Sequence, residues 1–219
     1  MGIFSSIMDV LFPPRCVFCR KVVKSDEPSV CADCRSSLPF ISGSAAETKG
    51  DFFDVCYSPL RYEGSVRSAV HRFKFKNAVG YADCFGELLA DCIRENLAGR
   101  YDMISWVPLS EKRRKTRGYD QAFLLAQAAA LSLDDIAVEL LVRHTDAAAQ
   151  STLSDRSERR ANVMGVYAVA DPELVADKRI LLIDDAVTTG ATLSECARTL
   201  LIAGAQSVVC ASLAKAGRV

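Results

Sequence analysis

The sequence predicts an α/β domain built on a parallel sheet flanked by helices, with a small four-cysteine module before it. Short aliphatic segments alternate with longer segments of helical periodicity, which is typical of parallel α/β sheets. Two C-x-x-C pairs stand near the start of the chain. The 219 residues accommodate one good-sized domain and a small appendage. We therefore divide the chain into a module at 1–40 and a domain at 51–219.

The elements of the larger domain are predicted in chain order from their periodicity. Residues 41–50, ISGSAAETKG, are small and polar and predict a linker. Apolar residues at helical spacing predict helices, and short aliphatic runs predict strands. The expected helices cover 65–76, 81–97, 120–131 and 193–203. The expected strands cover 53–62, 103–107, 138–142, 165–169, 180–183 and 208–213, and the last of them is expected to close the sheet.

The cysteine pairs of the N-terminal module have the spacing of a metal site. Cys16 and Cys19 are followed, after eleven residues, by Cys31 and Cys34. Two such pairs can hold one Zn²⁺ in a tetrahedral thiolate cage, and a cage filled by four cysteines predicts a structural zinc. Disulfides are disfavoured because nothing points to an oxidising compartment, and an iron–sulfur cluster stays an alternative. The other cysteines are expected to be buried small hydrophobic residues: Cys56, Cys84, Cys92, Cys196 and Cys210.

Charge and hydropathy limit the class of protein. The formal net charge is zero, so the whole-chain balance does not favour a nucleic-acid partner. No apolar run approaches the roughly 20 residues of a membrane span. The start, MGIFSSIMDVLFPP, lacks the features of a signal peptide. It matches a myristoylation pattern, but we interpret it as an apolar segment that packs on the domain. A cytoplasmic protein with no membrane span is expected.

The segment RILLIDDAVTTGAT, at 179–192, is the most informative for function. The aliphatic residues at 180–183 predict a buried parallel strand, which Asp184 and Asp185 close. A turn rich in threonine follows, and then a helix. Ligands of open α/β sheets bind at the carboxyl ends of strands, and free N–H groups at a helix start suit a phosphate. Carboxylates accept hydrogen bonds from hydroxyls, so the segment could hold a phosphorylated sugar at both ends.

Other nucleotide and phosphate motifs fit this segment less well. A Walker B strand requires GxxxxGK[ST] upstream, and the chain has none. A response-regulator receiver domain requires most of a domain after the carboxylates, where only a short tail follows Asp185. GxGxxG is absent, which disfavours a dinucleotide site. A strand that ends in two aspartates without function is the remaining alternative.

Two basic segments accompany the aspartate pair. The first, WVPLSEKRRKTRGYDQA at 106–122, begins at a strand end, so its loop should open on the same face as Asp184. Its five cations either form a solvated charge run or meet anions: Lys112, Arg113, Arg114, Lys115 and Arg117. The second, QSTLSDRSERRAN at 150–162, brings three arginines to one side of an expected helix, where they suit bidentate phosphate contacts: Arg156, Arg159 and Arg160.

The segment at 179–192 resembles the phosphoribosyl-pyrophosphate (PRPP) motif of type I phosphoribosyltransferases, which has four hydrophobic residues, two acidic residues, a Thr/Gly loop and a helix. The resemblance implies that Asp184 and Asp185 bind the ribose hydroxyls. It also implies that the loop binds the 5′-phosphate through these residues: Ala186, Val187, Thr188, Thr189, Gly190, Ala191 and Thr192. The implied fold is the type I phosphoribosyltransferase-like parallel sheet.

Essentially the whole chain is similar to one branch of these proteins, the ComF family of competence proteins. The motifs that carry the resemblance are the paired C-x-x-C, LRYEGSVRSAVHRFKFKN, VPLSEKRRKTRGYDQA, QSTLSDRSERRAN and LLIDDAVTTGAT. The chain departs from the family at Asp120, where Asn is usual, and at Asn77, where Gly is frequent.

The ComF resemblance implies roles for further residues. It places Pro108, Leu109 and Ser110 in a pyrophosphate-binding loop, 150–162 in a flexible loop over PRPP, and 62–76 in a hood. Arg156 and Arg160 are then PRPP ligands. The residues assigned to catalysis are Asp184, Asp185 and Arg159. The implied cofactors are a structural Zn²⁺ and a Mg²⁺ that accompanies PRPP.

Two functions remain open from the sequence. Displacement of pyrophosphate at ribose C1 needs no protein nucleophile, and neither His71 nor His144 stands in an acid–base constellation. The first function is therefore Mg²⁺-dependent phosphoribosyl transfer to an unknown acceptor. The second, implied by the resemblance, is a DNA-uptake factor that binds single-stranded DNA and works with other uptake proteins. The zero net charge and low aromatic content disfavour the second.

Overall fold

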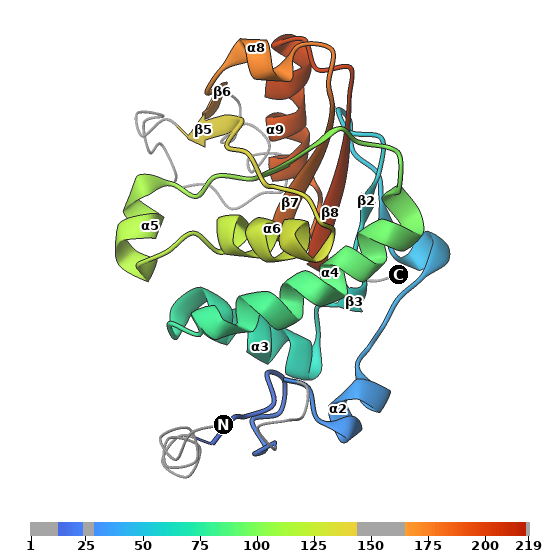
Figure 1. Cartoon of the computed structure of the whole chain (residues 1–219), viewed down its shortest axis with the longest axis vertical. Coiled ribbons are helices and arrows are strands. Elements are labelled where there is room, and N and C mark those ends of the chain that lie inside the picture. The colour runs from blue at the N-terminus through green and yellow to red at the C-terminus, as the bar shows by residue number, and fades with distance from the viewer. Residues whose placement is uncertain (1–12, 24–28, 144–164, 218–219) are drawn as a thin grey trace.

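A six-stranded, mainly parallel sheet forms the centre of the chain in a computed structural model that describes residues 13–23, 29–143 and 165–217. The strands are β1 (Glu47–Thr48), β2 (Cys56–Tyr57), β3 (Leu60–Arg61), β4 (Met103–Trp106), β7 (Arg179–Val187) and β8 (Ser207–Lys215). Their order is β1-β2-β8-β7-β4, with β3 also pairing β8 (Figure 1). Only the β1–β2 pair is antiparallel. The predicted α/β fold class is thus confirmed.

Alternate residues of β7 pack on opposite faces of the sheet, as the period of two in a strand requires. Leu181 and Ile183 join the core that includes α3 (Gly64–Phe75), α4 (Ala82–Leu97) and α6 (Gln121–Ser132). Ile180 and Leu182 join a second core, to which α8 (Pro172–Val175) and α9 (Ala191–Ile202) contribute. A small antiparallel hairpin of β5 (Leu141–Arg143) and β6 (Tyr167–Val169) packs in the second core. The side chains of Asp184 and Asp185 therefore leave β7 on opposite faces of the sheet.

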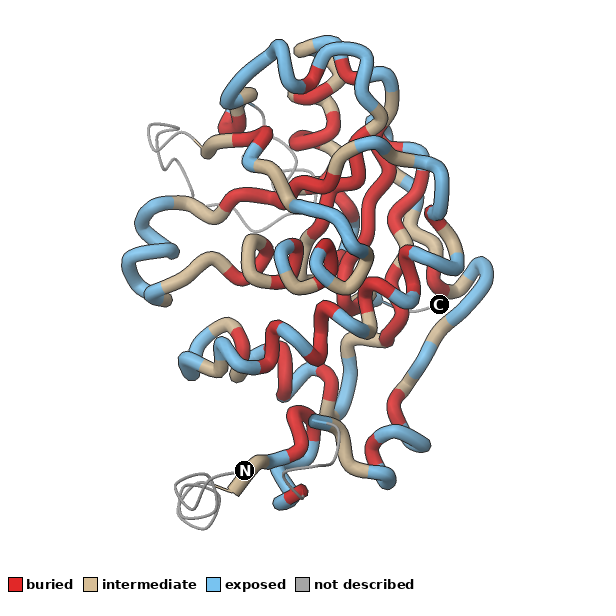
Figure 2. Tube along the Cα trace, in the orientation of Figure 1, coloured by how far each residue is buried: buried red, intermediate tan, exposed pale blue. Residues whose placement is uncertain are grey.

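The helix pair α4 and α6 packs closely because small residues line the contact. A Cβ atom added at Gly86 would lie 2.5 Å from Cβ of Ala128, so only glycine fits there. Ala122, Ala126 and Ala129 are buried on α6. This close pair lies on one face of the sheet, whereas α5 (Glu111–Arg117) is exposed over nearly all of its length (Figure 2).

Several elements differ from the sequence-based expectation. The stretch 53–62 forms two short strands, and the expected linker contains a 3₁₀ turn (Gly43–Ala45) and β1. The expected loop with five cations is instead a helix, α5 (Glu111–Arg117). β7 continues through the aspartates to Val187, because Ala186 and Val187 still pair with β8. β8 does not close the sheet, since it pairs with β2 and β3 on one side and β7 on the other.

Three short elements had no counterpart in the prediction, namely α2 (Ala32–Ser37), a 3₁₀ turn (Val79–Tyr81) and α8. The expected helix at 150–162 lies outside the described residues. Over the stretches that the structure describes, every helix is too short or too polar to traverse a lipid bilayer.

Candidate functional site

The four cysteines of the N-terminal module converge on one point. The sulfur atoms of Cys16, Cys19, Cys31 and Cys34 all lie within 4.8 Å of one another. Cys16 and Cys34 are buried, and Cys19 is exposed. Four thiolates at this spacing fit the tetrahedral shell of a structural Zn²⁺, which leaves no open position for a substrate.

Backbone amides prepare one of these thiols for a metal. Burial raises the pKa of Cys16, but N–H groups of Cys19, Cys31 and Phe18 outweigh it and lower that pKa to about 6. The N–H of Cys31 donates to Cys16 Sγ at 3.4 Å. A thiolate is the form that ligates zinc, so the turn favours the ligating state before metal arrives.

The five remaining cysteines are all buried, as predicted. Burial raises the pKa of Cys56, Cys84 and Cys92 to about 12, and raises the pKa of Cys196 and Cys210 as well. Because the thiolate is the nucleophilic form, these thiols are poor nucleophiles at neutral pH.

A pocket at the carboxyl end of the sheet collects the aspartate pair and several cations. Asp184 and Asp185 on β7 line this carboxylate pocket together with Pro108 and Leu109, which follow β4. β4 and β7 are adjacent parallel strands, so their ends reach the same edge. The cations that line it are Lys74, Arg113, Arg117 and Arg143.

The predicted 186–192 loop forms the wall of an adjoining pocket of about 320 Å³. All seven residues of this loop line it, and Asp184 and Arg143 are shared with the carboxylate pocket. The loop leads into the N-terminus of α9, where the first N–H groups of a helix are free to bind an anion. The two pockets therefore meet at Arg143, Asp184 and Thr192, which line both of them.

Ionisation of Asp184 is unfavourable in this pocket. Burial first, and then repulsion from Asp185, raise the pKa of Asp184 to about 7, although Lys74 opposes the rise. Lys74 Nζ pairs with Asp185 Oδ1 at 2.7 Å, with both side chains at most one-fifth exposed. Burial lowers the pKa of Lys74, but Asp185 and Asp184 outweigh it, so the net shift is upward. Lys74 is thus the cation that pairs directly with Asp185, beside the three arginines that also line the pocket.

Asp120 joins the carboxylate pocket to α6. Its Oδ2 accepts a hydrogen bond from the N–H of Leu109 at 2.8 Å, and its Oδ1 accepts from the N–H groups of Ala122 and Phe123. It is therefore the N-cap of α6 and also holds the 108–110 loop. Burial raises its pKa, as does the charge of Asp185. An asparagine has a single side-chain acceptor oxygen, so it could keep the cap bonds to Ala122 and Phe123 or the bond to Leu109, but not both sets.

The basic cluster divides between two faces of α5. Arg113 and Arg117, four residues apart, line the carboxylate pocket, while Arg114 and Lys115 line a different groove. Burial lowers the pKa of Arg117 although Asp185 opposes this, and Arg117 Nη1 donates to Gln121 Oε1 at 2.6 Å. The expectation that the cluster faces the carboxylates therefore holds for two of its five cations.

Ser110, which was predicted to belong to the pyrophosphate-binding loop, is the N-cap of α5. Its hydroxyl oxygen accepts the N–H of Arg113 at 3.4 Å, and Gly118 ends the helix with φ of 83°. An N-cap serine and a C-terminal glycine are ordinary helix signals. They stand in the sequence and could have identified α5, had the charge run not suggested a loop.

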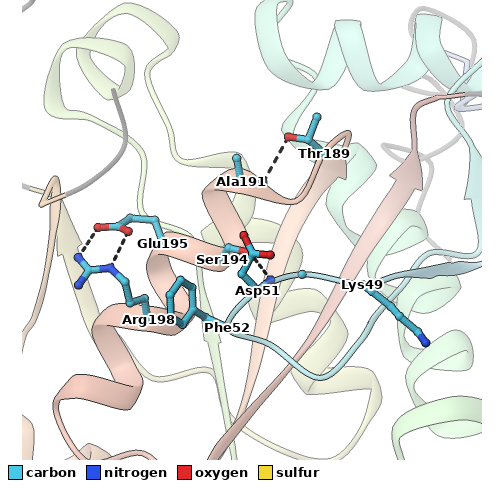
Figure 3. Close-up of a pocket in the computed structure, with 9 residues that line it drawn as sticks. Lys49, Asp51, Phe52, Thr189, Ala191, Ser194, Glu195 and Arg198 are labelled. Atoms are coloured by element: carbon cyan, nitrogen blue, oxygen red, sulfur yellow. Dashed lines mark hydrogen bonds and ion pairs between the residues drawn. The ribbon is translucent and has the colours of Figure 1, made fainter. Parts of the chain in front are cut away.

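The segment before β2 supports the 186–192 loop from behind. Gly190 has φ of 74°, and a Cβ atom there would lie 3.2 Å from the Phe53 ring. Beside it is a pocket of about 210 Å³, where the N–H of Asp51 donates to Ser194 Oγ at 3.3 Å (Figure 3). The first turn of α9 is thereby held against the chain that leads into the sheet.

Sequence reasoning missed the cations that approach from distant elements. Lys74 was predicted only as one residue of the 62–76 hood, and no role was predicted for Arg143. Arg143 stands beside Tyr167 at the hairpin, donating to its hydroxyl at 3.2 Å. No local motif marks either residue, because each reaches the pocket through tertiary packing. Arg156, Arg159 and Arg160 lie outside the described residues.

Comparison with known proteins agrees with this arrangement. A double zinc ribbon domain matches residues 7–59, and a phosphoribosyl transferase domain matches residues 120–218. DNA utilization protein YhgH of Salmonella typhimurium is 30% identical over 88% of this chain and 86% of its own length. The chain belongs to the ComF family. Other ComF relatives are Competence protein F of Haemophilus influenzae, 26% identical over 92% of this chain and 97% of its own, and Competence protein ComFC of Streptococcus pneumoniae, 26% identical over 89% and 91%.

A solved structure is also similar in part. The glutamine PRPP amidotransferase from B. subtilis, complexed with ADP and GMP, aligns over 61% of this chain and 26% of its own, with 20% identity and a TM-score of 0.42. The match to a double zinc ribbon domain and the cluster of four cysteines support the structural zinc that the cysteine spacing predicts.

Proposed function

We propose that this ComF protein binds PRPP at the carboxyl end of its sheet and transfers the phosphoribosyl group to an acceptor in a Mg²⁺-dependent reaction. The observation that carries the proposal is the convergence of the adjacent carboxylates, the glycine-containing loop and four cations on two adjoining pockets. The match to a phosphoribosyl transferase domain supports the same interpretation. A cytoplasmic location accompanies it, because a thiolate metal site suits a reducing compartment.

The proposed arrangement gives each part of PRPP a chemically suitable partner. Asp184 and Asp185 accept hydrogen bonds from the ribose hydroxyls. The 5′-phosphate lies in the 186–192 loop, at the N-terminus of α9. The pyrophosphate meets the backbone of the 108–110 loop and the nearby cations, with Arg113 and Arg117 supplying planar guanidinium groups for phosphate oxygens.

Catalysis would rest on charge and position. The C1–O bond breaks and its electron pair leaves with pyrophosphate, so that the ribose is oxocarbenium-like in the transition state, and an electron pair of the acceptor forms the new bond to C1. Carboxylates below the ring favour that positive charge, and cations at the pyrophosphate favour the leaving group. By the family resemblance, Arg159 and its neighbours Arg156 and Arg160 would complete this cationic shell.

The pocket suits a Mg²⁺ carried by the substrate. Asp120, Asp184 and Asp185 present carboxylates around it, and Mg²⁺ in such sites is bound by one or two carboxylates together with substrate phosphates. The metal would supply screening of the pyrophosphate charge. The protein residues would fix the ribose and keep the leaving group near their cations.

Calorimetric titration with PRPP, with and without Mg²⁺, tests the proposal. Each hydrogen bond to a charged group is worth about 1.5–3 kcal/mol, so Asp184→Asn with Asp185→Asn should weaken PRPP binding at least about tenfold. The matched control is Asp134→Asn with Asp135→Asn, another adjacent aspartate pair, exposed after α6. Equal PRPP affinity in the wild type and the first double variant would place the ligand elsewhere. Release of pyrophosphate with candidate acceptors would then test turnover.

A second candidate function is supported by the groove on the other side of α5. Trp106, Tyr119 and Phe123 line it together with Arg114 and Lys115, although Trp106 is buried and Asp120 and Glu139 line the groove as well. The rings of Trp106 and Phe123 lie 4.9 Å apart. Aromatic surfaces beside cations are the usual elements of single-stranded nucleic-acid sites. The low aromatic content of the chain is thus offset by concentration at one place, which favours single-stranded DNA binding, in cooperation with other DNA-uptake proteins.

The two faces of α5 separate these functions experimentally. Arg113→Ala with Arg117→Ala should weaken PRPP binding and spare DNA binding. Arg114→Ala with Lys115→Ala should spare PRPP binding and reduce the salt dependence of DNA binding, by a slope of roughly 0.7 for each phosphate that the variant no longer neutralises. Loss of both activities from either pair would indicate one shared anionic site and would reject the division.

A further inference from the structure

Arg72 on α3 donates hydrogen bonds to the cysteine module. Its Nη2 donates to the carbonyl oxygens of Val17 and Phe18, at 2.7 and 2.8 Å. Both carbonyls belong to the turn between Cys16 and Cys19, the first pair of the metal cage. A metal bound by these two thiolates fixes that turn, and so fixes the acceptors of the Arg72 guanidinium.

A shared phenol strengthens this contact. The Tyr81 hydroxyl accepts from Arg72 Nε at 3.2 Å and from Arg20 Nη1 at 3.0 Å. Arg20 follows Cys19 directly. The turn is therefore bonded to the main domain both through its own carbonyl oxygens and through the Arg20 side chain. Figure 1 shows α3 next to the module, between it and the helices that cover the sheet.

The next two residues of α3 are held by the main domain, and the second of them, Lys74, lines the carboxylate pocket. Phe73 is fully buried and its carbonyl oxygen accepts a hydrogen bond from the Tyr119 hydroxyl, in the turn before α6. Lys74 pairs with Asp185 at 2.7 Å. Residues two apart on a helix point to nearly opposite sides, so Arg72 and Lys74 hold α3 between two sites.

We propose that Arg72 is a positioning residue through which the metal-bound cysteine module holds α3, and with it Lys74, in place against Asp185. Loss of the metal would release the turn carbonyls and let the last turn of α3 shift. Lys74 would then leave the carboxylate pair partly uncompensated, since its ammonium is largely buried and has Asp185 as its ion-pair partner. Metal occupancy of the module would thereby modulate PRPP binding. This part of the inference rests on the proposed function.

A double-mutant cycle tests whether Arg72 acts through Lys74. Arg72→Met should weaken PRPP binding about fivefold or more, the usual size of coupling between sites, and Arg72→Lys should restore part of the loss. In a Lys74→Gln background, Arg72→Met should cause little further loss, because residues in one chain of contacts are not additive. The control is Arg67→Met, an exposed arginine on the same helix. Equal losses from Arg72→Met in both backgrounds would overturn the proposal.

Amide hydrogen exchange reads the coupling without any ligand. The N–H of Asp185, on β7, donates to Asp184 Oδ1 at 2.8 Å. Arg72→Met and removal of zinc by a chelator should each speed exchange at this amide as well as in the last turn of α3, whereas Arg67→Met should not. Faster exchange confined to the cysteine module would refute the coupling. Failure of the wild type to bind PRPP would instead refute the proposed function, and the exchange result would still decide the coupling.

Discussion

Asp184→Asn should make the protein more stable at pH 8 while weakening its proposed ligand binding. Burial and the charge of Asp185 raise the pKa of Asp184 from 3.8 to about 7. At about 1.36 kcal/mol for each tenfold change in proton affinity, this corresponds to about 4 kcal/mol of strain in the ionised native state. The pair with Lys74 shares that strain, so we expect a gain of roughly 2–4 kcal/mol in the free energy of unfolding.

The gain should depend on pH with a defined sign. Between pH 3.8 and about 7 the native state keeps the Asp184 proton and the unfolded state has lost it. Stability of the wild type therefore falls as the pH rises through this window. By the same reasoning the advantage of Asp184→Asn should shrink to about 1.5 kcal/mol at pH 5.

Denaturant unfolding at pH 5 and pH 8 measures this difference. The m-value should stay constant, so that the change lies in the midpoint. Asp102→Asn is a control of opposite sign: Asp102 pairs with Arg179, whose hydrogen bonds lower the pKa of Asp102 to about 2. That variant should lose stability at pH 8. Destabilisation by Asp184→Asn at pH 8, or the same change at both pH values, would refute the reasoning.

Three other outcomes are expected. Cys31→Ser should remove about one zinc per chain by metal analysis and increase proteolysis of the module, while the α/β domain keeps its circular dichroism; purified wild type with neither zinc nor iron would contradict this. Gly190→Ala should cost about 1 kcal/mol or more by thermal unfolding, because φ is 74° and Phe53 lies close, and unchanged stability would mean that the loop relaxes freely. PRPP affinity should rise with pH through about 7 as Asp184 ionises, with a smaller slope in Asp184→Asn, and parallel profiles would assign the titration to PRPP itself.

The parts of this protein that the sequence predicts well are those specified locally. Four buried residues of α3 recur at helical spacing, and the carboxylate pair follows an aliphatic run whose composition predicts a buried strand. The cysteine cage follows from spacing alone. In each case neighbouring residues contain the physical reason for the structure.

The parts that escape prediction depend on contacts between distant segments. Lys74 reaches Asp185 because α3 crosses the end of the sheet, and no residue near Lys74 in the sequence indicates this ion pair. The prediction of a loop at 111–117 was wrong. The run of cations suggested a loop, whereas Ser110 is a helix N-cap and the segment forms α5. The strand at 53–62 is interrupted at Ser58 and Pro59, because Pro59 has no N–H and the N–H of Ser58 donates to the carbonyl oxygen of Ala46, although both halves keep one register with β8. The catalytic role of the pocket residues stays a prediction.

The central place of β8 has a consequence for biosynthesis. Cys210 pairs with Cys56, and Val209 pairs with Leu181, so β8 joins strands that are separated by more than a hundred residues of chain. During translation β2 is made long before β8, and neither β2 nor β7 can complete its hydrogen bonding until β8 emerges. Contacts between such distant segments slow folding, and the apolar edge of β7 stays unpaired until β8 is available. Chains truncated before residue 207 should therefore engage chaperones far more than chains released at full length.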